Sequence, residues 1–163
     1  MKRKFVVVLV SALLLTACGE DGADKPYFEF AGGGFVFNYN IAEAYYGFVA
    51  RVLRRIPEGA VLEAVFENPD GGDPLVVRQT AVAGRADYVF RTPGVQGVEA
   101  DRGYHVELRV LEPGTEKLLA SYERSYRSTA DQAILPKQPT TVGPGYQLNP
   151  NSELLYPPPG SSN

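Results

Sequence analysis

The sequence is poor in the residues that build disulfides, metal cages and most catalytic centres. Its 163 residues include one cysteine, one histidine and no tryptophan. A single cysteine cannot close an internal disulfide, so the core alone must hold the folded part together. A single histidine leaves no partner for a histidine-based triad or metal cage, and no serine stands in a nucleophile elbow. We therefore expect no catalytic residues, no metal site and no cofactor.

The sequence also lacks an apolar run that could span a bilayer near its start. A membrane-spanning helix needs about 20 apolar residues, whereas the run from Phe5 to Leu15 has 11 residues and is interrupted by Ser11. Three basic residues precede this run: Lys2, Arg3 and Lys4. A basic patch followed by a short apolar segment is typical of an export signal.

The lone cysteine follows this segment in the stretch Leu15, Thr16, Ala17, Cys18. The stretch resembles the lipobox of bacterial lipoproteins at all four positions. The resemblance implies cleavage before Cys18 and attachment of a diacylglyceryl group to its thiol, in many such proteins with acylation of its amine. Two or more acyl chains anchor a protein stably. The alternative is an ordinary export signal with a chance cysteine.

The residue after Cys18 is Gly19. In some Gram-negative bacteria an aspartate at this place retains a lipoprotein in the inner membrane. We therefore expect a lipid-anchored protein that faces the periplasm, with the outer membrane favoured over the inner membrane.

Composition divides the chain into four parts. We expect a cleaved signal at 1–17, a lipidated cysteine with a polar tether at 18–25, a β-sandwich domain at 26–128 and a tail at 129–163. The tail is rich in Pro, Gly, Asn and Ser, so we expect it to be extended or disordered, with polyproline character near Pro157–Pro159. Two alternatives stay open for the tail: a flexible end, or a segment that docks on a partner or on the sandwich.

The charge balance limits the choice of partners. The formal net charge is −3, and loss of the signal would leave 13 basic against 19 acidic residues. This acidic balance argues against nucleic acid or anionic lipid as the main partner. The expected partners are the membrane, through the Cys18 lipid, and an envelope protein or glycan.

Apolar and polar residues alternate with period two through the middle of the chain, which predicts half-buried strands. Turn-forming stretches with Pro and Gly separate these segments about every 8 to 12 residues. The pattern predicts an all-β fold, an antiparallel sandwich of about seven to eight strands. The residues expected to face inward are Phe35, Phe37, Tyr39 and Ile41; Leu62, Ala64 and Phe66; and Tyr104, Val106, Leu108 and Val110.

The segment 41–56 also fits a helix. Asn40 and Glu43 have the spacing of a capping box, and Pro57 would end the helix. However, Gly47 would cost about 1 kcal/mol in a helix interior, and the aromatic and β-branched residues around it prefer strands. We expect a strand, paired with residues 60–67 through the turn at 57–59.

The stretch from Val98 to Val110 resembles fibronectin type III domains. These domains place an apolar residue six positions before a strand tyrosine whose hydroxyl bonds back across the corner, and Val98 and Tyr104 have this spacing. The corner lacks the usual proline of the family. The missing tryptophan and disulfide fit the fibronectin variant better than the immunoglobulin one. The resemblance implies an immunoglobulin-like or fibronectin-III-like sandwich.

Three further features have an ordinary structural explanation. The stretch 68–73 clusters oxygen ligands as calcium loops do, but a hairpin turn explains it. The glycines of 31–35 could cradle phosphate only before a helix, so we expect a bend or bulge between two strands. His105 is expected on the outward face of a strand as an ordinary surface residue.

The candidate binding surface is Tyr122, Arg124 and Tyr126, which share one face of an expected strand. Tyrosine and arginine are typical interface anchors. The alternative is that one or both tyrosines belong to the core and Arg124 lies at the sheet rim. A second basic cluster, Arg51, Arg54 and Arg55, is expected to be solvated.

Together these features predict a non-catalytic binding or assembly module of the cell envelope. One rival is a glycan-acting enzyme, which would need two carboxylates facing each other about 5 to 10 Å apart. The other rival is a structural lipoprotein without a dedicated ligand.

Overall fold

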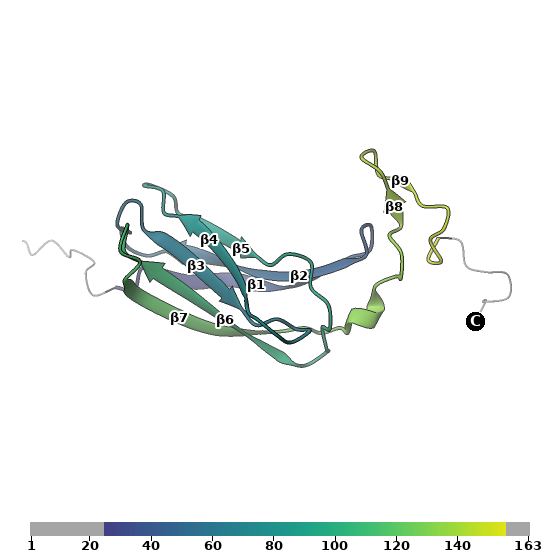
Figure 1. Ribbon diagram of the computed structural model, residues 1–163, viewed down its shortest axis with the longest axis horizontal. Helices are drawn as coiled ribbons and strands as arrows, with labels where there is room; N and C mark the ends of the chain where they lie inside the picture. Colours follow the sequence, from purple (N-terminus) through teal and green to yellow (C-terminus); the bar gives the residue numbers. More distant parts are fainter. Residues whose placement is uncertain (1–24, 156–163) are drawn as a thin grey trace, which may run out of the picture.

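The computed structural model describes residues 25–155, which form a sandwich of two antiparallel sheets followed by a small tail (Figure 1). The predicted all-β sandwich is confirmed. The predicted lipidation site Cys18 and the cleavage residues before it, Leu15, Thr16 and Ala17, lie outside the described residues, as does Pro157–Pro159. Within 25–155 no helix has the length and apolar character needed to cross a membrane.

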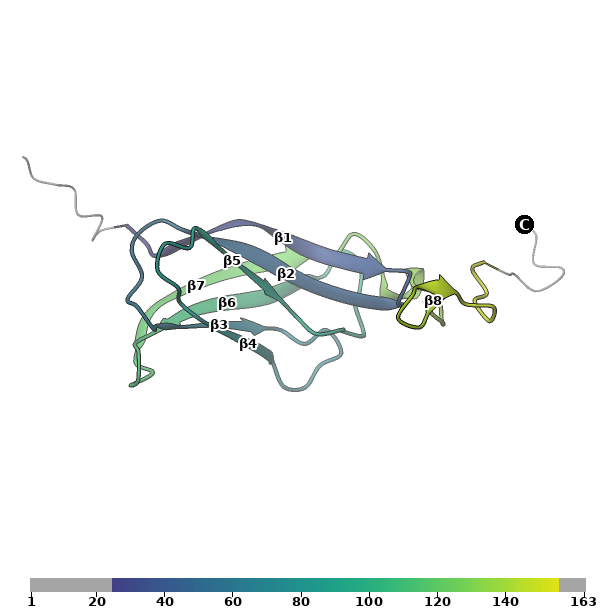
Figure 2. The ribbon, with the colours of Figure 1, turned by 90° about the horizontal axis from the view of Figure 1, so that it is seen from above.

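Seven strands make the two sheets, which lie face to face (Figure 2). One sheet has the order β1-β2-β5, with bounds β1 (Phe28–Asn38), β2 (Glu43–Val52) and β5 (Asp87–Arg91). The other has the order β4-β3-β6-β7, with bounds β3 (Val61–Phe66), β4 (Leu75–Thr80), β6 (Gly103–Leu111) and β7 (Leu118–Arg127).

Eight of the twenty buried apolar residues in the described chain are aromatic, and their rings are the largest side chains in the core between the sheets. Tyr46 and Phe48 of β2 point inward, and the ring of Phe48 lies 5.6 Å from that of Phe66 on the opposite sheet. Tyr46 stacks on Phe35 at 4.5 Å. Offset and edge-to-face pairs of this kind add about 0.5–1.5 kcal/mol each beyond the burial of their area. A dense ring cluster is therefore what holds this disulfide-free core together.

Within the segment 41–56 the structure has a strand, β2, over Glu43–Val52 and no helix, but the predicted pairing of this strand is wrong. β2 pairs with β1 and β5, and β3 belongs to the other sheet. Either arrangement would bury the apolar faces of both strands, but tight hairpins use loops of two to five residues, and the connection from β2 to β3 is longer than that. The linker 53–60 carries the chain from one sheet to the other.

The alternation predicted at the end of β1 stops earlier than expected. Tyr39 and Ile41 lie in the turn between β1 and β2, where Ala42 has a φ of 53°, and Ile41 is exposed. The glycines form a bulge between Phe30 and Gly32, within one continuous strand and not between two strands.

The predicted tyrosine corner is present. The Tyr104 hydroxyl accepts a hydrogen bond of 2.7 Å from the amide of Glu99, which ties the start of β6 to the preceding loop. Val98 and Tyr104 are both buried. The geometry that the resemblance implied is therefore found in the chain.

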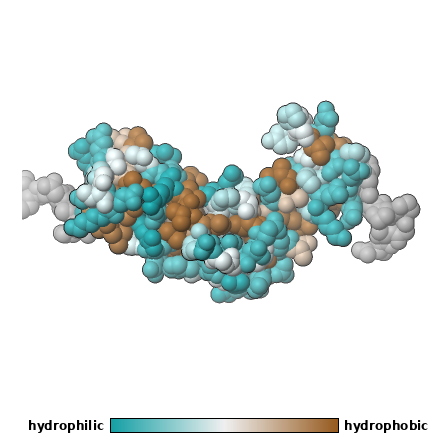
Figure 3. All heavy atoms as spheres, viewed as in Figure 1, coloured by the Kyte–Doolittle hydropathy of each residue, from teal (hydrophilic) through white to brown (hydrophobic). Residues whose placement is uncertain are grey.

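The described part of the tail combines extended segments with local turns. It contains a 3₁₀ turn, η2 (Gln132–Ile134), and a small ladder between β8 (Thr141–Val142) and β9 (Gln147–Leu148). The amides of Thr140 and Thr141 donate to the carbonyls of Tyr39 and Asn40 in the β1–β2 turn. In the space-filling view the tail rises at the right as a lobe with apolar atoms at its surface (Figure 3).

We predict that Gly33→Ala lowers the free energy of unfolding by about 1–3 kcal/mol. The added methyl group would lie 2.5 Å from Cε1 of Tyr126 and 2.6 Å from the carbonyl oxygen of Gly47. Gly32→Ala is the matched control, because nothing lies within 4 Å of its added methyl group. Urea unfolding followed by circular dichroism measures both. Equal stability of the two variants would contradict the close packing of β7 on β1.

Candidate functional site

The residues predicted as a binding surface alternate along β7 and contact the edge of β1: Tyr122, Arg124 and Tyr126. The Tyr122 hydroxyl accepts from the amide of Tyr27 at 2.8 Å. Arg124 donates to the carbonyl of Phe30 at 3.3 Å, and the Tyr126 hydroxyl donates to the carbonyl of Gly32 at 3.2 Å. The three side chains thus satisfy backbone groups at an exposed sheet edge.

These contacts limit what the three residues offer to a partner. Tyr126 is 7% exposed and belongs to the core, and Tyr122 packs against the core. Burial also raises the pKa of Tyr126. Arg124 alone is exposed, at the rim of the sheet. Their role in binding stays a prediction, and the geometry assigns them a structural one.

The structure also shows where the other features noted in the sequence lie. His105 is exposed on β6, and residues 68–73 form the loop between β3 and β4, with Gly71 and Gly72 at positive φ. Within the described chain no group of three His, Cys, Asp or Glu side chains is placed to hold a metal ion. Arg51 pairs with Glu29 at 3.2 Å.

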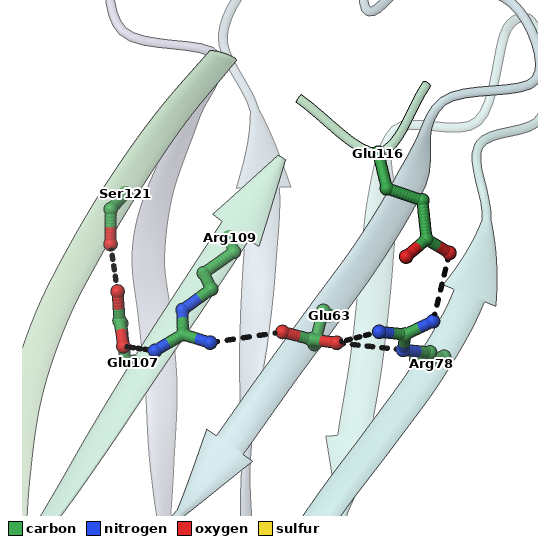
Figure 4. Close-up of polar contacts among 6 residues, drawn as sticks. All are labelled: Glu63, Arg78, Glu107, Arg109, Glu116 and Ser121. Carbon is green, nitrogen blue, oxygen red and sulfur yellow. Dashed lines mark hydrogen bonds and ion pairs between the residues drawn. The ribbon is translucent and has the colours of Figure 1, made fainter. Parts of the chain in front are cut away.

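A row of charged side chains crosses the outer face of the four-stranded sheet (Figure 4). Glu63, only 6% exposed, lies between Arg78 of β4 and Arg109 of β6, at 2.5 and 3.1 Å. Arg109 also contacts Glu107 at 2.5 Å, and Ser121 of β7 donates to Glu107 at 2.5 Å. Both carboxylates contact an arginine, and Arg109 is shared between them, so the charges of this row are paired with one another across β3, β4 and β6.

The alternation in the sequence places Glu63, Glu107 and Arg109 on outward faces but does not reveal their pairing. The strand register brings the charges together, because Glu63 stands directly opposite both Arg78 and Arg109. Opposite charges at facing positions of neighbouring strands attract each other. The hydrogen bond from Arg109, with that from Ser121, holds the pKa of Glu107 below its usual value, although partial burial opposes the shift.

A shallow hollow of about 370 Å³ lies on the outer face of the other sheet. We call it the glycine hollow. It lies over β1, β2 and β5, and the outward-facing residues that line it are Gly34, Val36, Tyr45, Gly47, Val49, Val89 and Arg91.

The glycine hollow exists because glycines replace side chains on the outward positions of this sheet. After the bulge in β1, Gly34 faces Gly47, and Gly47 faces Arg91 across the next strand pair. No atom lies within 4 Å of the place where a Cβ of Gly34 would be. Val36 and Val89 stand at the sides and are 44% and 60% exposed. The result is an apolar surface without a covering element in the described chain.

The glycine hollow contains one charged side chain. The guanidinium of Arg91 lies 4.4 Å from the ring centroid of Tyr45, and Arg91 forms no ion pair with any residue of 25–155. Beyond the hollow, toward the start of β1, the outer face carries three charged residues. There Arg51 forms ion pairs with Glu29 and Asp87. The chemistry of the glycine hollow is therefore apolar with one unpaired cation.

A second hollow, of about 440 Å³, lies between the linker after β2 and the loop before β5. Arg55, Glu58 and Arg85 are its charged lining residues, among mainly apolar neighbours. It holds one carboxylate and two guanidinium groups.

Comparison with known proteins adds no assignment to these surfaces, because no family model, curated protein or solved structure matches the chain. Sequence reasoning missed the glycine hollow. The available signal was the outward set of the first strand, Gly32, Gly34 and Val36, which continues the same alternation that predicted the core.

We predict that Glu107→Gln makes the stability of the protein less sensitive to acid. The folded carboxyl has the lower pKa, so its contribution is present above the ordinary value of 4.5 and is lost as pH falls through the folded value. Urea unfolding at pH values from about 7 to 3 measures the slope. Glu123→Gln, on the exposed strand β7 beside Glu107, is the control. Parallel slopes for wild type and Glu107→Gln would contradict the prediction.

Proposed function

We propose that the chain is a lipid-anchored, non-catalytic binding module of the cell envelope that holds a partner polypeptide in the glycine hollow. The lipobox-like stretch at Leu15–Cys18 supports the anchor. The uncovered apolar face of β1, β2 and β5 supports the binding role. Apolar patches that stay exposed on a folded domain commonly mark interaction sites.

The lining of the glycine hollow favours a polypeptide over a glycan. Sugars stack on the open face of an aromatic ring, and the Arg91 guanidinium lies over the Tyr45 ring at 4.4 Å. The other lining residues are valines, glycines and phenylalanines, which suit apolar side chains. Arg91 adds a preference for a carboxylate, since a charge-assisted hydrogen bond to an acid is stronger than a neutral one.

The rival enzyme has less support in the described part of the chain. Paired carboxylates would have to face each other across a cleft. The glycine hollow is lined by no carboxylate and the second hollow by Glu58 alone. Glu63 and Glu107 do lie near each other, but Arg109 binds both of them. These positions favour the binding proposal.

We predict that Cys18→Ser releases the protein from the membrane fraction. Without the thiol no acyl chain is attached, and the remaining polypeptide has no lipid to hold it. Fractionation of cells that express each form, with immunoblotting of membrane and soluble fractions, measures the change. Mass spectrometry of the wild-type N-terminus is the direct control. A Cys18→Ser protein that still sediments with membranes would contradict the anchor.

We predict that a partner crosslinks to the glycine hollow and not to the opposite sheet. A photoreactive phenylalanine analogue at Val36 should capture the partner polypeptide in intact envelopes, and Val89→Asp should reduce the yield at least about tenfold by placing an unpaired charge in an apolar contact. Val76→Asp is the matched control, because Val76 is 53% exposed on the outer face of the four-stranded sheet and Val89 is 60% exposed. Equal loss in both variants would contradict the site.

A further inference from the structure

We propose that the glycine hollow of one molecule takes up the tail segment 153–155 of a second copy of this chain. This inference rests on the proposed binding role of the hollow and names its occupant. The contact joins two different surfaces, so it links copies head to tail.

The tail exposes more apolar side chains than a folded segment of its length needs. Five of the fourteen large apolar residues that are exposed in the described chain lie within 141–155: Val142, Tyr146, Leu148, Leu154 and Leu155. None of them enters the core of its own molecule. The surface of the tail therefore matches the hollow in apolar character.

Hydrogen bonds order the backbone of the tail just before Glu153. The side chain of Asn149 donates to the carbonyl of Pro139 at 2.7 Å, and the amide of Asn149 donates to the carbonyl of Thr140 at 2.8 Å. The amide of Ser152 donates to the carbonyl of Asn149. The turn that precedes Glu153 is thus formed before any contact with a second copy, which lowers the entropy that binding must overcome.

The two surfaces also carry complementary charges. Glu153 is exposed and forms no ion pair within residues 25–155, and the same holds for Arg91. A carboxylate and a guanidinium can form two parallel hydrogen bonds. With Glu153 on Arg91, the following Leu154 and Leu155 would lie against glycine backbone and valine side chains.

The arrangement of the chain favours a second copy over the same molecule. Within one molecule the hollow and the two leucines are both exposed. The tail extends beyond the β1–β2 turn, at the end opposite to the point where the chain enters the sandwich (Figure 1, Figure 2). A contact of three residues is weak in solution, but anchoring in one membrane raises the effective concentration of the copies.

Cysteine pairs in the full anchored chain test this contact. Val89→Cys together with Leu154→Cys, treated with an added oxidant in isolated envelopes, should give a ladder of dimers, trimers and larger species on a non-reducing gel. Val76→Cys with Leu154→Cys is the control and should give no ladder. A product that stops at dimers, or an internal crosslink within one chain, would overturn the head-to-tail contact.

Charge reversal provides a second, independent readout. In the Val89→Cys and Leu154→Cys background, Arg91→Glu or Glu153→Arg should each lower the ladder about fivefold or more, because a repulsion replaces an attraction. The two reversals together should restore it. All these positions are exposed, and circular dichroism confirms folding. If no ladder forms while the Val36 crosslinker captures another envelope protein, this inference fails and the proposed function stands; if neither captures anything, both fail.

Discussion

Tyr46 and Phe48 of β2 pack against the rings of the opposite sheet, and the rest of the molecule depends on this contact. No disulfide can form within one copy of a chain with one cysteine, so the two sheets are held by ring packing. The Tyr46 hydroxyl donates to the carbonyl of Glu67, so its polar end is satisfied where the ring is buried. Burial in turn raises the pKa of Tyr46. β2 is the central strand of its sheet, and β1 and β5 pair with its two edges.

The two outer faces of the sandwich use their polar groups in different ways. On the four-stranded sheet, Glu63 and Arg109 belong to a row in which each carboxylate contacts an arginine. On the three-stranded sheet, glycines leave an apolar floor, and Arg91 lies over the ring of Tyr45 without an ion-pair partner among residues 25–155. The charges of the row on the four-stranded sheet are paired with one another. The three-stranded sheet exposes an apolar surface and an arginine without an ion-pair partner in the described chain. This asymmetry is what places the proposed binding role on one side of the molecule.

The sequence predicted the strands well because alternation with period two reports directly which side chains are buried. It also predicted the corner at Tyr104, where residue spacing alone sets the hydrogen bond. It could not predict that β2 and β3 belong to different sheets, because the pattern of buried residues in a strand does not identify the strand that pairs with it. Nor could it distinguish Tyr126 from a surface tyrosine. A tyrosine that packs at the edge of the sheet and one that binds a partner occupy the same positions in the alternation of the strand. The glycine hollow was missed because glycines occupy its floor, and binding residues are recognised in a sequence by their side chains.

The side chains of β7 that contact β1 have a consequence for how copies of this chain can associate. Open strand edges invite further strands to add by backbone pairing, which is the usual start of amyloid-like growth. Here Tyr122 and Tyr126 already bond to the backbone along that border of β1, and Gln79 bonds to the carbonyl of Val89 on the opposite border. A foreign strand that pairs with either edge of this sheet would first have to break these hydrogen bonds. Copies of this chain are therefore less suited to join through the edges of the three-stranded sheet than through its outer face.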